Sequence, residues 1–119
     1  MRKYAWLKEP RRLDENTYVC KIMLYEAEEG VYLFAYASPG AIQCSYDRCY
    51  DSLADLYDDW NALIDERGWI ELDDPLPYCQ QDAFIPLRVK GRNIDKPEWG
   101  KFETLHEGTW VEYKPYCDF

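Results

Sequence analysis

The residues that could carry chemistry in this chain are its five cysteines, its one histidine and its many carboxylates. Cys44 and Cys49 are separated by four residues, the upper limit of the spacing found in structural zinc sites. Two more ligands would have to come from Cys20, Cys79, Cys117 or His106. Because no second close pair exists, Cys44 and Cys49 are weak zinc candidates, and we predict no metal and no other cofactor.

Catalysis has little support in these residue types. Cys49 precedes a predicted helix whose dipole would favour a thiolate, but an activated cysteine normally has a base beside it. The only histidine, His106, lies in a predicted tight turn. Adjacent carboxylates such as Asp58 and Asp59 are abundant, yet adjacency in sequence does not create the opposed geometry that acid–base catalysis needs. No glycine-rich phosphate loop is present. We therefore assign no catalytic residue, and a small hydrolase is the least favoured hypothesis.

An amphipathic helix is expected from Ser52 to Arg67. Ser52, with Asp55 three residues later, resembles a capping box, apolar residues then recur at helical spacing, and Gly68 closes the run. The side away from the apolar stripe is acidic, although like charges one turn apart cost a few tenths of a kcal/mol per pair. The acidic residues of this face and of its flanking loops are Asp47, Asp51, Asp55, Asp58, Asp59, Asp65, Glu66, Asp73 and Asp74.

This acidic face has two interpretations. It could be a solvated surface that keeps the protein soluble, and the helix dipole favours Asp55 near the N-terminus, though not Asp65 or Glu66. It could instead be complementary to a basic surface, for example that of a nucleic-acid-binding protein, because spaced carboxylates imitate the negative field along a duplex. The second interpretation predicts a basic protein partner.

Aromatic residues form a second pattern. Tyr32, Phe34 and Tyr36 alternate along a predicted strand and therefore share one of its faces. They could pack beneath the helix or beneath the last predicted hairpin. They could also form an exposed aromatic platform for a carbohydrate, a cationic ligand or a protein.

Strands are expected on both sides of the helix. The predicted strands are Lys3–Leu7, Tyr18–Glu26, Val31–Ala37, Ala41–Tyr46 and Ala83–Lys90, with a final hairpin of Phe102–Leu105 and Trp110–Tyr113. This order predicts a single α+β domain over residues 1–119, in which an antiparallel sheet of about 5–7 strands packs against one helix.

Composition limits the classes of partner. The chain has 119 residues, 47% of them hydrophobic, with 23 acidic against 14 basic side chains. A net charge of −9 argues against direct nucleic-acid binding and against binding to an anionic membrane. The acidity is concentrated in residues 13–85, whereas residues 1–12 carry five basic groups and one acidic group. No secretory signal is visible and the cysteine count is odd, so we expect a soluble, cytoplasmic protein with reduced thiols.

These observations favour a small, acidic, non-enzymatic interaction protein whose acidic helix face binds a basic protein partner. In gross composition alone, the chain resembles bacterial immunity proteins and phage-type inhibitors that block nucleases, and this resemblance implies an inhibitor-like role. The alternative is a small-ligand or carbohydrate-binding module that uses the aromatic platform. An exposed edge strand near Pro86 or in the final hairpin could pair with a second copy of the chain, so a homodimer is possible.

Overall fold

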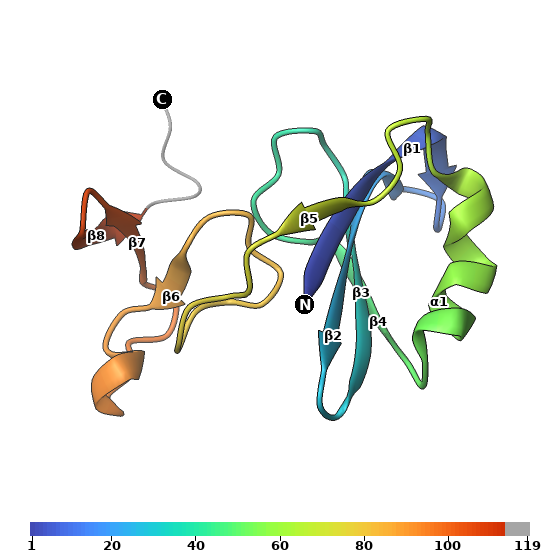
Figure 1. The fold of residues 1–119 in the computed structure, drawn as a ribbon. Helices are drawn as coiled ribbons and strands as arrows, with labels where there is room; N and C mark the ends of the chain where they lie inside the picture. Colours follow the sequence, from blue (N-terminus) through green and yellow to red (C-terminus); the bar gives the residue numbers. More distant parts are fainter. Residues whose placement is uncertain (114–119) are drawn as a thin grey trace. The chain divides into compact units, whose positions relative to one another are not determined.

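The structure is a computed structural model that describes residues 1–113, and its elements form an α+β fold made mostly of strands (Figure 1). The chain divides into two units, Met1–Asp74 and Pro75–Phe119. The first unit contains a five-stranded antiparallel sheet and one α-helix, and the second contains a three-stranded antiparallel sheet. The predicted class, antiparallel strands combined with one amphipathic helix, is confirmed.

The first sheet has the strand order β4-β3-β2-β1-β5. Its strands are β1 (Arg2–Arg12), β2 (Tyr18–Ala27), β3 (Gly30–Tyr36), β4 (Tyr46–Tyr50) and β5 (Ile70–Leu72). Strands β2 and β3 form the predicted hairpin, with Tyr25 opposite Tyr32. Alternation of side chains along β3 puts Val31, Leu33 and Ala35 on one face and the aromatic residues on the other.

The fourth strand is not where the sequence predicts it. The sequence predicts a strand over Ala41–Tyr46, whereas β4 runs from Tyr46 to Tyr50. The Lys21 ammonium group donates to the carbonyl oxygens of Pro39 and Ala41, at 2.9 and 3.3 Å, and these bonds tie the preceding segment into a loop. The ladder with β3 begins only where the Ser45 N–H donates to the Ala35 carbonyl oxygen.

Helix α1 (Leu53–Trp60) begins as predicted but ends earlier. The Ser52 side chain accepts a hydrogen bond from the Asp55 N–H at 3.2 Å, which caps the first turn. A 3₁₀ turn, η1 (Asn61–Leu63), follows, and the predicted helical stretch to Arg67 does not form. The Asp65 N–H donates instead to the Trp6 carbonyl oxygen, and Ile64 forms a bridge with Leu7. Pairing with β1 therefore replaces the last helical turns.

The core of the first unit lies between α1 and one face of the sheet. Leu56 and Trp60 are the buried residues of the helix, as its apolar spacing predicts. They belong to one cluster with residues of β1, β2, β3 and β4, namely Ala5, Leu7, Val19, Ile22, Leu24, Val31, Leu33, Ala35 and Tyr50, together with Ile64. Each large apolar side chain removed from water contributes about 1.5–3 kcal/mol before entropy is counted, so this layer fixes α1 on the sheet.

The second unit contains β6 (Leu87–Val89), β7 (Phe102–His106) and β8 (Thr109–Tyr113) in the order β6-β7-β8. The predicted final hairpin is confirmed. The strand predicted over Ala83–Lys90 is reduced to Leu87–Val89, since Pro86 has no N–H to donate to a ladder. Its carbonyl oxygen accepts a hydrogen bond from the Thr104 hydroxyl at 2.7 Å. A short 3₁₀ turn, η2 (Arg92–Ile94), lies in the connection between β6 and β7.

Candidate functional site

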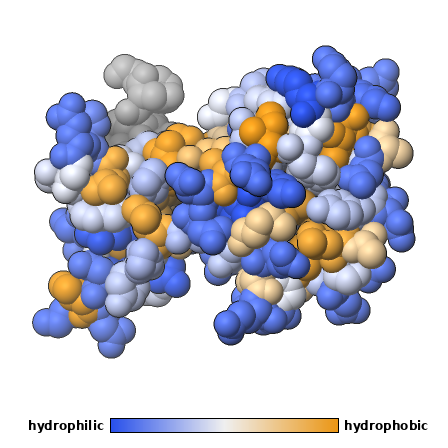
Figure 2. Space-filling view, in the orientation of Figure 1, coloured by the Kyte–Doolittle hydropathy of each residue, from blue (hydrophilic) through white to orange (hydrophobic). Residues whose placement is uncertain are grey.

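The candidate site is an open hollow where β4 leads into α1, and we call it the acidic hollow. Its volume is about 330 Å³, and it is lined by Arg48, Cys49, Tyr50, Asp51, Asp55, Asp58 and Asp59. Because Ser52 caps the helix directly after the strand, the end of β4 and the exposed side of α1 face the same space. On the side of the first unit that carries α1, the visible apolar patches are small and are separated by hydrophilic side chains (Figure 2).

One aspartate of the hollow is held by the protein itself. The Tyr50 hydroxyl donates to Asp59 Oδ2 at 2.7 Å, and Arg48 Nη1 lies 3.5 Å from the same oxygen. The indole N–H of Trp60 donates to the Tyr50 oxygen at 3.0 Å. Burial raises the pKa of Tyr50, and its hydrogen bond to Asp59 raises that pKa further. The phenol therefore stays protonated and anchors Asp59 to the core.

The other three aspartates of the hollow are unpaired in the part of the chain that the structure describes. Asp51, Asp55 and Asp58 are exposed, and among residues 1–113 no ion pair involves any of them. The last turn of α1 also carries no basic residue that could offset Asp58. The hollow therefore presents a concentrated negative charge on rigid elements.

Five of the predicted acidic residues lie outside the hollow, and three of these, Asp65, Asp73 and Asp74, are already paired or lie far from it. Arg67 forms a bidentate contact with Asp65 and thereby lowers the pKa of that carboxyl group. Asp73 and Asp74 follow β5, four strands away from β4, which is roughly 19 Å at the usual strand spacing. The amino group of Met1 lies 3.0 Å from Asp74 Oδ1.

Glu66 and Asp47 are exposed but line no part of the hollow. Asp47 pairs with Phe34 across β4 and β3, on the face of the sheet away from the helix core. The acidic surface that the structure assembles is therefore smaller than the set of nine acidic residues that the sequence suggests.

The three aromatic residues proposed as a platform differ in exposure. Tyr36 is 0% exposed and Phe34 is 7% exposed, whereas Tyr32 is half-buried. The rings of Tyr32 and Phe34 are stacked with centroids 6.2 Å apart, and the Tyr32 hydroxyl donates to Glu29 at 3.1 Å. Only Tyr32 of the three offers part of its ring to a ligand.

The cysteines and His106 do not converge in the part of the chain that the structure describes. Cys44 is half-buried, Cys49 is exposed at the acidic hollow, and His106 is exposed in the β7–β8 hairpin. Cys117 lies outside the described residues. Within residues 1–113 no group of three or more metal-ligating side chains is found. Among the same residues, none of the helices has both the length and the apolar character needed to cross a membrane.

The sequence prediction missed Arg48 and Tyr50, which line the hollow and contact Asp59. Both alternate with Tyr46 along β4 and face the helix, a pattern that is visible only when the strand is placed at Tyr46–Tyr50. A strand that ends at Tyr46, as the sequence predicts, does not contain Arg48 and Tyr50 and therefore does not place them on this face.

The chain matches no family model, and neither curated proteins nor solved structures give a match.

Proposed function

We propose that this protein is a small, non-enzymatic interaction protein that binds a basic protein partner through the acidic hollow. The observation that carries the proposal is the set of three exposed aspartates, Asp51, Asp55 and Asp58, which form no ion pair within residues 1–113 and lie beside the anchored Asp59. Asp55 and Asp58 are one turn apart, and Asp58 lies near the negative end of the helix dipole. This arrangement costs stability in the isolated protein, and a partner's lysine or arginine residues would offset that cost.

The hollow suits a basic side chain that projects from the partner. A lysine or arginine entering it would meet carboxylates from both α1 and the end of β4, while Arg48 is already occupied with Asp59. Complementary charge of this kind mainly accelerates association and sets specificity, and salt weakens it. An inhibitor that covers the basic surface of its target would work in this way.

We also propose a cytoplasmic location, which would suit a chain with an odd number of cysteines. Cys20, Cys44, Cys49 and Cys79 are thiols rather than disulfides. Disulfides are rare in the cytosol, where thiols are kept reduced.

The test is an affinity capture with charge-matched variants. The immobilised protein is exposed to lysate of its source cell, bound proteins are eluted with salt and identified, and each is purified and titrated against the protein. The hollow variant is Asp51→Asn, Asp55→Asn and Asp58→Asn. Asp59 is left intact because the Tyr50 hydroxyl donates to it.

The matched control is Glu15→Gln, Glu28→Gln and Glu66→Gln, which removes the same charge from exposed positions outside the hollow. We expect a basic protein that binds the wild type and the control but not the hollow variant. Equal binding to both variants would mean that net charge alone attracts the partner, and the hollow would then have no role.

The aromatic-platform alternative has no comparable support. It depended on three accessible rings, and two of them, Phe34 and Tyr36, are buried. We therefore do not propose a carbohydrate or small-ligand site on this face.

A further inference from the structure

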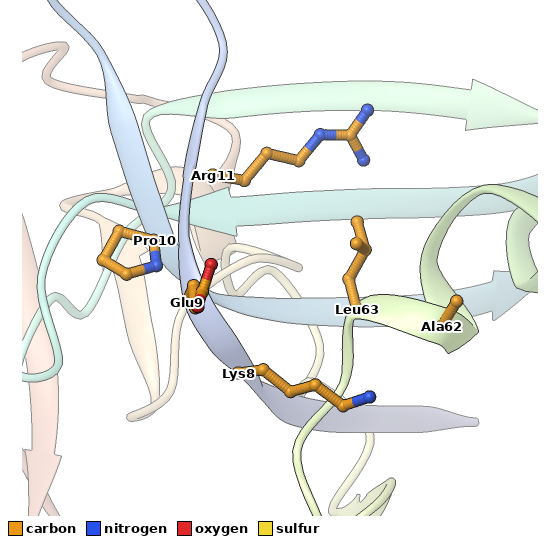
Figure 3. Close-up of a pocket in the computed structure, with 6 residues that line it drawn as sticks. All are labelled: Lys8, Glu9, Pro10, Arg11, Ala62 and Leu63. Carbon is orange, nitrogen blue, oxygen red and sulfur yellow. The ribbon is translucent and has the colours of Figure 1, made fainter.

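A second hollow, of opposite charge, lies in the first unit between the C-terminal part of β1 and η1 (Figure 3). Its volume is about 300 Å³, and it is lined by Lys8, Glu9, Pro10, Arg11, Ala62 and Leu63. We call it the basic groove. The side chains of Lys8 and Arg11 extend from β1 in the same direction, with Leu63 between them (Figure 3).

An irregularity in β1 opens this groove. Trp6 pairs with Lys21 of β2, but the next paired residue is Arg11, opposite Val19, so Leu7–Pro10 bulge out opposite Cys20 alone. Leu7 turns into the core and bridges to Ile64. Lys8 to Arg11 are exposed as a result.

Along Lys8–Arg12, the outer edge of β1 pairs with no strand in the described part of the chain. Strand β5 pairs only with Arg2–Tyr4, and past the Leu7 bridge no strand among residues 1–113 pairs with this edge. Pro10 and the bulge disfavour the pairing of a partner's strand with this edge of β1, because proline lacks an N–H and a bulge breaks the hydrogen-bonding register. Recognition at this groove must therefore come from its side chains.

The two cations are available and one of them is held in place. Neither Lys8 nor Arg11 forms an ion pair within the described residues, and both are exposed. The Arg11 guanidinium lies over the ring of Trp60, with Cζ 4.4 Å from the ring centroid. This stacking orients the planar group but uses none of its N–H donors. Arg11 can therefore pair with a carboxylate without first being ordered.

We propose that the basic groove binds an extended peptide segment of a partner protein in which an apolar side chain is flanked by carboxylates. The apolar side chain would contact Pro10, Ala62 and Leu63, and the carboxylates would pair with Lys8 and Arg11. The volume is at the lower end of the range for ligand pockets, roughly 300–1,000 Å³, so it suits one side chain rather than a large ligand.

Charge complementarity identifies the occupant. Residues 1–12 carry five basic groups and one acidic group in a chain of net charge −9. A nucleic acid would be repelled by the rest of the chain and would gain nothing from the apolar floor, whereas a short acidic and apolar segment uses both features. This inference goes beyond the proposed function because it uses other residues and the opposite charge.

The test is a titration of the ¹⁵N-labelled protein, followed by NMR, with a blocked peptide of alternating aspartate and leucine. Two matched peptides carry serine in place of leucine or asparagine in place of aspartate. We expect shifts at the amides of Lys8, Glu9, Arg11, Ala62 and Leu63 and at the Trp60 indole N–H. Each matched peptide should bind about tenfold more weakly, because it loses either the apolar contact or the ion pairs.

Two pairs of variants test the site. Lys8→Gln with Arg11→Gln should weaken binding about tenfold, whereas Lys3→Gln with Arg12→Gln removes the same charge from the same strand and should not. Ala62→Glu places a carboxylate at the exposed edge of the groove and should abolish binding, and Ala54→Glu on α1 is its control.

Four results would overturn the proposal. The first is that millimolar peptide causes no chemical-shift changes, and the second is that the changes map to another surface. The third is that the serine peptide binds as tightly as the aspartate–leucine peptide. The fourth is that octanoate, a simple apolar carboxylate, binds as tightly as the aspartate–leucine peptide. The variant with Asp51→Asn, Asp55→Asn and Asp58→Asn should bind the peptide at least as well as the wild type. Failure of the basic groove to bind peptide is therefore distinguishable from failure of the acidic hollow to bind a basic partner.

Discussion

Arg11 and Trp60 are stacked, with the guanidinium carbon 4.4 Å from the centroid of the indole ring. The edge of the same indole donates its N–H to Tyr50, which in turn donates to Asp59 in the acidic hollow. Trp60 is only 3% exposed and belongs to the helix core. One buried side chain therefore contacts both the basic groove and the acidic hollow and holds their polar groups in place.

Replacing Trp60 with phenylalanine should weaken the fold by removing the N–H donor while keeping an aromatic ring. The Tyr50 oxygen would lose its partner and a small cavity would form, so we expect the free energy of unfolding to fall by about 1–3 kcal/mol. Urea denaturation measures this loss. Trp69→Phe is the matched control, because the indole N–H of half-buried Trp69 donates to Asn61 Oδ1 at 2.8 Å in a hydrogen bond that is exposed to solvent. Equal losses in the two variants would contradict a buried structural role for the Trp60 N–H.

Tyr50 should make the protein sensitive to alkaline pH. Burial and the hydrogen bond to Asp59 raise the pKa of Tyr50 above its ordinary value of 10.0. The folded state therefore binds this proton more tightly than the unfolded state. The resulting stabilisation is fully present below pH 10 and is lost as the pH rises through the folded-state pKa.

Denaturation of wild type and Tyr50→Phe across this range tests the prediction. The difference in free energy of unfolding between the wild type and Tyr50→Phe should shrink as the pH rises. The same difference between the wild type and Tyr18→Phe should not change with pH, because Tyr18 is exposed. A constant difference between wild type and Tyr50→Phe would show that the phenol proton does not contribute.

Local sequence patterns predict the strands that pair with their neighbours in the sequence. Strands β2 and β3, and likewise β7 and β8, are joined by short turns and lie close to their predicted positions. The displaced β4 has another cause, because Ala41–Tyr46 is apolar enough for a strand but the Lys21 ammonium group holds Pro39 and Ala41 in a loop. That contact joins residues far apart in sequence, so local sequence patterns cannot predict it.

The candidate site was predictable in part for the same reason. Helical spacing put Asp55, Asp58 and Asp59 on one exposed face, and all three line the acidic hollow. Helical spacing could not show that Asp59 is anchored by Tyr50 and Arg48, since these residues come from β4. The basic groove depends on the bulge in β1 and on the early end of α1, and both result from tertiary pairing.

Asp58→Lys should stabilise the protein and also weaken binding to a basic partner. Asp58 lies in the last turn of α1, which has no basic residue, so a positive charge there complements the helix dipole and relieves repulsion with Asp55. We expect a gain of about 0.3–1 kcal/mol in the free energy of unfolding. Thermal or urea denaturation measures the gain, and titration with the captured partner measures the loss of binding.

Asp55→Lys should lower the stability of the protein, whereas Asp58→Lys at the same hollow should raise it. Asp55 lies in the first turn, where the dipole favours an acidic residue, so this variant should lose stability while also weakening partner binding. If the two variants changed stability in the same direction, the helix dipole would not explain either effect. If both left partner binding unchanged, the acidic hollow would not be the binding site.

Tyr78→Gly should stabilise the second unit. The Cys79 N–H donates to the Leu76 carbonyl oxygen at 3.0 Å, which closes a turn with Pro77 in its second position and Tyr78 in its third. Tyr78 has a φ of 68°, the left-handed conformation that glycine adopts in type II turns and that costs other residues about 1–3 kcal/mol.

Tyr78 is 54% exposed, so removing its side chain loses little packing. Because glycine also loses more backbone freedom on folding, the expected net gain is about 1 kcal/mol. Hydrogen exchange of amides in β6 and β7 measures the stability of this unit. Gly91→Ala is the converse control, since its φ is 80° and a Cβ there would collide with the Lys96 carbonyl oxygen. A loss of protection in Tyr78→Gly would mean that contacts of the Tyr78 ring outweigh the backbone strain.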